Sequence, residues 1–121
     1  LVWAVHAAER AVAAERDNRF YLNTLGVALY RLGAWERASV TLQRADELDR
    51  ESPTGASRPI TLAVLAVCQA QLAEPLQAAA TFERACRAAD TDGSASTKTI
   101  LAEARRELTA LEVLDPSADE H

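Results

Sequence analysis

The chain has 121 residues, of which 49% are hydrophobic and 26% are charged, so it can form one domain with a core of its own. Its formal net charge of −5 at pH 7 argues against a nucleic-acid partner, because binding to phosphates requires a basic surface. No apolar run approaches the roughly 20 residues of a membrane span, and the first residues lack a signal-peptide pattern. We therefore expect no membrane association and a cytoplasmic location.

The composition favours an all-α fold. Alanine, the strongest helix former, occurs 26 times, whereas glycine and proline occur four times each and aromatic residues make up only 5%. Two cysteines, Cys68 and Cys86, are too few for a disulfide framework, and both lie in Ala-rich helical stretches. We interpret them as small buried apolar side chains, with a disulfide or a reactive thiol as the alternatives.

Hydrophobic periodicity predicts three helices in the first half of the chain, at about 2–15, 20–32 and 35–49. Asp17 or Asn18 is the expected N-cap of the second helix, and Gly33 follows that helix, as glycine commonly does just past a helix end. The apolar side of the third helix is formed by Ala38 or Val40, Leu42, Ala45 and Leu48. A cluster of Ser, Thr, Gly and Pro at 51–57 predicts a loop.

The second half of the chain predicts three further helices, at about 60–72, 75–89 and 97–114. Ser57 is the expected N-cap of the first of them, and Pro59 and Pro75 suit first turns, where a missing N–H is no loss. The last helix has a single apolar stripe, formed by Ile100 or Leu101, Ala104, Leu108 and Leu111. Residues 90–94 predict a second loop, and we expect a frayed acidic tail after Pro116.

The second and third helices share a pattern of large and small residues, which consists of Leu22, Leu25, Gly26 and Leu29, then Ala38, Leu42 and Ala45. This pattern resembles the tetratricopeptide repeat (TPR), in which a bulky residue, Leu-Gly and Tyr are followed by Ala, Phe and Ala. Trp35 occupies the aromatic position that opens the second helix of such a repeat. The unit at 19–52 has 34 residues, which is the TPR length.

The same frame fits again from Pro59, and the matching residues are Leu62, Leu65, Ala66, Ala78, Phe82 and Ala85. This copy is looser, because Ala66 replaces the glycine and Gln69 replaces the tyrosine. Counted backward from Arg19, the first helix is the second half of a preceding repeat. We therefore predict one domain, an α–α superhelix of TPR-like repeats with a capping helix. Its parts are a partial repeat (1–18), a repeat (19–52), an inserted loop (53–58), a degenerate repeat (59–92), a cap (96–115) and a tail (116–121).

Small residues in this pattern are expected where two helices approach closely. Gly26, Ala38 and Ala45 leave room for the facing helix, and larger residues such as Leu25 fill the space between the helices. Each helix pair buries its apolar stripe only by stacking on its neighbours. The pattern thus predicts that all four of these residues are buried.

The resemblance implies a protein-binding function, because the first helices of successive TPRs line a concave groove that holds peptides or partner helices. The groove positions of the family fall on Phe20, Asn23, Val27, Tyr30 and Arg31, and on Ile60, Ala63, Val67, Ala70 and Gln71. They are too apolar for the carboxylate clamp of chaperone-binding TPRs. Tyr30 and Arg31 are the residue types most often found in binding hot spots, so we expect them to contact the partner.

A second interpretation is a structural or regulatory role. The sequence from Tyr21 to Gly33 is similar to repeats near the C-termini of large bacterial proteins, including Ser/Thr protein kinases with TPR tails. In such a parent the groove would be filled by a neighbouring domain, or by a second copy of the chain.

No catalytic constellation is found in the sequence. His6 and His121 lie at opposite ends without metal-ligating neighbours at a useful spacing, and Glu103, Arg106 and Glu107 read as a charged outer face of the last helix. We therefore expect no enzymatic activity, no cofactor and no metal in this segment.

Overall fold

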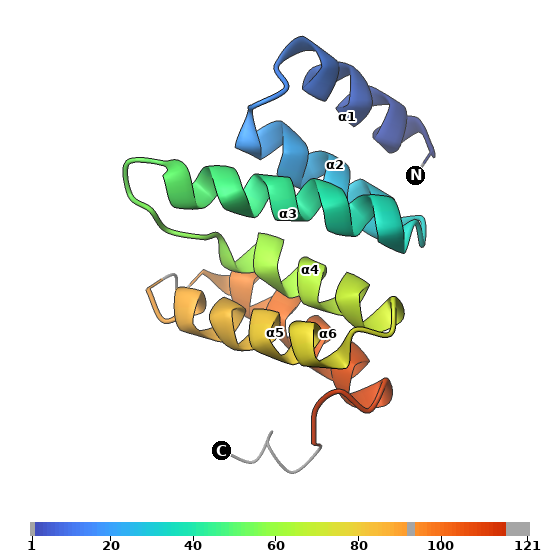
Figure 1. Ribbon diagram of the computed structural model, residues 1–121, viewed down its shortest axis with the longest axis vertical. Helices are drawn as coiled ribbons and strands as arrows, with labels where there is room; N and C mark the ends of the chain where they lie inside the picture. The colour runs from blue at the N-terminus through green and yellow to red at the C-terminus, as the bar shows by residue number, and fades with distance from the viewer. Residues whose placement is uncertain (1, 92–93, 116–121) are drawn as a thin grey trace.

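The computed structural model describes residues 2–91 and 94–115, and it is all-α (Figure 1). The described residues form six helices, which are α1 (Val2–Ala14), α2 (Arg19–Arg31), α3 (Trp35–Glu51), α4 (Pro59–Gln71), α5 (Pro75–Ala89) and α6 (Ala95–Ala110). This confirms the predicted fold class and the number of helices. Residues 92–93 of the second predicted loop and the predicted tail after Pro116 lie outside the described residues.

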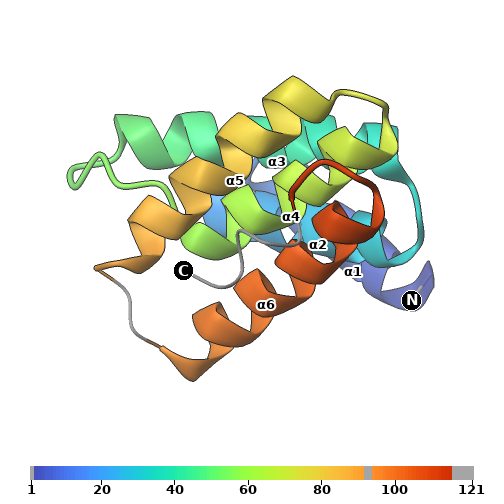
Figure 2. The same ribbon diagram turned by 90° about the horizontal axis from the view of Figure 1, so that it is seen from below.

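The helices form a repeat-like stack. α2 and α3 make one antiparallel pair, α4 and α5 make a second, and α1 packs on α2 at one end (Figure 1). Seen from below, α3 and α5 lie in an outer layer, while α2 and α4 lie beneath them (Figure 2). α6 lies against α4 on the side away from α5, and it contacts α5 much less than it contacts α4. The side of α2 and α4 that faces away from α3 and α5 is therefore the side where α6 packs.

The helix ends follow from local hydrogen bonding. Asn18 caps α2, because its side-chain oxygen accepts hydrogen bonds from the N–H groups of Phe20 and Tyr21 at 3.0 and 3.1 Å. The prediction that Ser57 caps α4 is wrong: Arg58 holds that position without a side-chain cap, and Pro59 follows it in the first turn. The hydroxyl of Ser57 instead accepts a hydrogen bond from Arg84 of α5.

Three helices end in the same left-handed turn. Gly33 after α2, Ala73 after α4 and Glu112 after α6 have φ values of +78°, +60° and +63°. At each of them the next residue donates its N–H to a carbonyl five positions back, as in a Schellman motif. The turn at Glu112 explains why α6 ends at Ala110 and not at Leu114 as predicted. Leu111, placed in the predicted apolar stripe, is consequently 40% exposed.

The core confirms the predicted close approach of α2 and α3. Gly26, Ala38 and Ala45 are buried, and Leu42 has no exposed surface. A Cβ atom added to Gly26 would lie 2.5 Å from the Cγ and Cδ2 atoms of Leu42, which is too close for an undisturbed contact. Leu25 is buried as well, so small residues do bring this helix pair together.

Candidate functional site: the groove between α2, α4 and α6

α6 covers the inner face of the second helix pair. Ala63 and Val67 of α4, two of the predicted groove residues, are 0% and 1% exposed. They face Ile100 and Ala104 of α6, and the space between the two helices there is too small for a water molecule. Ala63 and Val67 therefore contact the chain's own last helix and not an open groove.

A polar contact holds α6 against α2. The hydroxyl of Tyr30 donates a hydrogen bond to Oε1 of Glu107 at 2.7 Å. Burial, together with this bond to a carboxylate, raises the pKa of Tyr30 above its usual value, so the hydroxyl remains a donor even in alkaline solution. Two residues earlier in α6, the guanidinium of Arg105 lies 5.0 Å from the centre of the Phe82 ring of α5.

Two adjoining clefts remain open along the seam between α2 and α6, and together we call them the α2–α6 groove. The first, of about 450 Å³, is lined by Val27, Arg31, Ile60, Ala95, Ser96, Thr99, Ile100 and Glu103. The second, of about 350 Å³, is lined by Tyr30, Arg31, Trp35 and Glu107. Arg31 lines both clefts, so the two clefts are neighbours on the surface.

The first cleft has an apolar floor and polar walls. Val27, Ile60 and Ile100 are half-buried, and each packs with part of its surface on the core. Arg31 is exposed on one wall and Glu103 is half-buried on the other. Within the described ranges neither side chain forms a hydrogen bond or an ion pair. The cleft thus offers an unused donor and an unused acceptor on either side of an apolar surface.

The second cleft is built from two aromatic rings and a carboxylate. The rings of Tyr30 and Trp35 have their centres 5.7 Å apart and are inclined by 51°. Trp35 is the aromatic residue that the sequence predicts at the start of the third helix, and it packs on the core between α2 and α3. Glu107 adds its carboxylate from α6, beside the Tyr30 hydroxyl.

The other predicted groove residues lie outside the two clefts. Asn23 donates a hydrogen bond to the hydroxyl of Thr61 at 2.6 Å and so joins α2 to α4. Phe20 is exposed near the start of α2, where the guanidinium groups of Arg19 and Arg58 lie 5.0 and 4.8 Å from its ring centre. Ala70 is half-buried and Gln71 is exposed, near the end of α4. The structure therefore brings Val27, Tyr30, Arg31 and Ile60 together.

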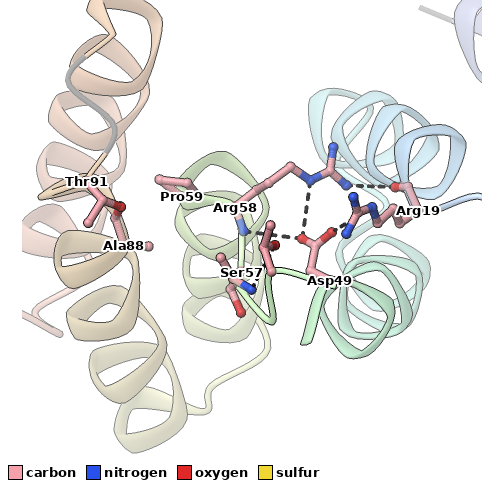
Figure 3. Close-up of a pocket in the computed structure, with 9 residues that line it drawn as sticks. Arg19, Asp49, Ser57, Arg58, Pro59, Ala88 and Thr91 are labelled. Carbon is pink, nitrogen blue, oxygen red and sulfur yellow. Dashed lines mark hydrogen bonds and ion pairs between the residues drawn. The ribbon is translucent and has the colours of Figure 1, made fainter. Parts of the chain in front are cut away.

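A third cleft, of about 260 Å³, lies at the inserted loop, and the charged residues that line it hold helices together (Figure 3). Asp49 is buried there, and its Oδ2 accepts hydrogen bonds from N and Nε of Arg58 at 3.3 and 3.2 Å. Its Oδ1 lies 3.7 Å from Nε of Arg19, and Arg58 also donates to the carbonyl oxygen of Arg19. These contacts fasten α2, α3 and the start of α4 to one another.

Sequence reasoning missed these ion pairs, although one signal was present. Asp46 and Asp49 lie in the last turns of α3, where the helix dipole disfavours negative charge. Both carboxylates are buried, and Arg84 of α5 pairs with Asp46 at 3.1 Å. Acidic residues at such positions indicate basic partners, but the sequence does not identify the partners.

Comparisons with protein-family models, with curated proteins and with solved structures found no match, so the TPR assignment stays a prediction from the sequence pattern. None of the helices in the described ranges is long and apolar enough to cross a membrane. Both cysteines are free. Cys68 is buried, as predicted, whereas Cys86 is half-buried and accepts a hydrogen bond from Arg105 at 3.8 Å, so the prediction of a buried side chain is wrong for Cys86.

Proposed function

We propose that this chain is a TPR-type protein-interaction module that binds an extended segment of another protein in the α2–α6 groove. The observation that supports this proposal is the first cleft, with its apolar floor between Arg31 and Glu103, which have no partner among the described residues. Its volume of about 450 Å³ is in the range of ligand pockets, although it accommodates only a few residues.

The chemistry of the cleft matches a peptide main chain. Arg31 is a donor for a peptide carbonyl, and Glu103 is an acceptor for a peptide N–H on the opposite side. An aliphatic side chain that points to Val27, Ile60 and Ile100 would lose its contact with water, a gain of about 1.5–3 kcal/mol for a residue such as leucine. An extended strand fits this site better than a helix of about 10 Å diameter, because α6 already covers the inner face of α4.

The proposal is tested by blocking the cleft. Random peptides are selected against the wild-type chain, and the affinities of the best binders are measured by fluorescence polarisation. Thr99→Arg places a long side chain in the cleft, whereas Ala102→Arg places the same side chain on the same helix outside it. We expect at least a tenfold loss of affinity for Thr99→Arg and no loss for Ala102→Arg, at equal thermal stability. Equal affinities for the two variants, or a selection without binders, would contradict the proposal.

A structural or regulatory role is the second candidate, in which the domain packs on, or dimerises, a larger enzyme such as a Ser/Thr protein kinase. It is favoured by large apolar side chains that are exposed outside the groove. Trp3 is 81% exposed on α1 and Leu76 is 83% exposed on α5. Light scattering over a range of concentrations tests dimerisation, and a mass that stays at one chain counts against it.

A further inference from the structure

We propose that the second cleft, between Tyr30, Trp35 and Glu107, receives a basic side chain of the bound segment. This inference rests on the proposed function, since it names the chemistry of the ligand of the same groove. The segment would carry an aliphatic residue for the first cleft and an arginine or lysine for the second.

The shape of the second cleft suits a cation. Two aromatic rings, inclined by 51° to one another, line the cleft, and a cation over an aromatic face is attracted by the ring's quadrupole. Glu107 uses Oε1 to accept the hydrogen bond of Tyr30, and its other carboxylate oxygen has no partner among residues 2–91 and 94–115. A guanidinium or ammonium group can therefore lie over a ring and also donate to this oxygen.

The charges along the groove also favour a basic ligand. Its charged lining consists of one cation, Arg31, and two carboxylates, Glu103 and Glu107. One negative charge is therefore left over, and the chain as a whole has a net charge of −5. An incoming cation neutralises the excess carboxylate, whereas an acidic ligand would add a third negative charge to the groove.

Arg31 does not prevent this arrangement. It is exposed, its guanidinium has no partner within the described residues, and it lines the first cleft together with Glu103. When a ligand cation occupies the second cleft, Arg31 can turn into the first cleft, where it donates to a carbonyl of the bound segment, and leave Glu107 to the ligand. The ligand cation then pairs with Glu107, and Arg31 and Glu103 stay available to the main chain of the bound segment.

The spacing of the two ligand residues follows from the helix. Val27 and Arg31 are four residues apart in α2, about 6 Å along the axis. Two residues of an extended strand span about 6.6 Å. The basic residue is thus expected two positions from the aliphatic one.

The test uses three short fluorescein-labelled peptides that differ at one position. Each has a leucine in a glycine–serine background and, two residues later, an arginine, a citrulline or a glutamate. Citrulline keeps the shape of arginine but has no charge, so the ratio of the two affinities isolates the charge. The variant Glu107→Gln retains an acceptor for Tyr30 and removes the negative charge, while Glu15→Gln makes the same change at an exposed position outside the groove.

We expect wild type and Glu15→Gln to bind the arginine peptide roughly five- to tenfold more tightly than the citrulline peptide, and the glutamate peptide most weakly. In Glu107→Gln the ratio of arginine to citrulline affinity should fall to within about twofold. A ratio of one in wild type, an unchanged ratio in Glu107→Gln, or no binding of the arginine peptide would overturn the inference. If peptides from the random selection nevertheless bind wild type more tightly than Thr99→Arg, the proposed function remains supported although this inference fails.

Discussion

Replacing Gly26 by alanine is expected to destabilise the protein, although alanine is the better helix former. The new Cβ would lie 2.5 Å from two carbon atoms of Leu42, which is fully buried. The helix preference of alanine over glycine contributes about 1 kcal/mol in favour of the variant. Crowding of a packed core costs about 1–3 kcal/mol, and two carbon atoms at 2.5 Å place this case in the upper half of that range, so we expect a net loss of about 1–2 kcal/mol.

Urea denaturation followed by circular dichroism measures this change, and a double-mutant cycle identifies its cause. Leu42→Val shortens the side chain that the new Cβ would meet. The double variant Gly26→Ala/Leu42→Val should therefore be more stable than the sum of the two single effects predicts. If Gly26→Ala is as stable as wild type or more stable, the helices do not meet closely at Gly26 and the reasoning fails.

Three further predictions concern the core, a helix end and the thiols. Leu25→Ala should lower the free energy of unfolding by about 2–5 kcal/mol, because Leu25 is buried between the helix pairs; an unchanged midpoint in urea would remove it from the core. Ala73→Gly should stabilise the protein by about 0.5–1 kcal/mol, since Ala73 has a φ of +60° and glycine takes that conformation freely. Gly33→Ala should destabilise the protein for the same reason. Effects in the opposite directions in the same assay would contradict the left-handed turn at these two positions. Burial raises the pKa of Cys68 to about 12, so its reactive thiolate is scarce at pH 8. Cys86, which is only half-buried, should therefore react first with a thiol reagent in the native protein, and faster labelling of Cys68, located by mass spectrometry, would contradict this.

The helices could be predicted closely from the sequence because their signals are local. Asn18 and Gly33 mark the two ends of α2, and Pro59 and Pro75 open α4 and α5 within their first turns. The end of α6 was predicted too late. Its left-handed turn is at Glu112, and glutamate rarely takes this conformation. The sequence therefore has no glycine that marks the end of the helix.

The candidate site was only partly predictable, because it depends on contacts between distant segments. The repeat frame assigns Val27, Tyr30, Arg31 and Ile60 to one face, and the structure brings them together. The apolar stripe of the last helix is visible in the sequence, but the spacing of its residues does not show which helix the stripe packs on. That α6 lies on α4 and makes one wall of the groove, with Glu103 and Glu107, follows only from the tertiary structure.

The central claim is that the α2–α6 groove binds an extended peptide, and mapping by NMR tests it most directly. A peptide selected against the wild-type chain is titrated into isotope-labelled protein, and the changes in backbone chemical shift are assigned. We predict that the largest changes fall on Val27, Arg31, Thr99 and Glu103, around the first cleft. Changes centred on the outer faces of α3 and α5, with these residues unaffected, would contradict the account.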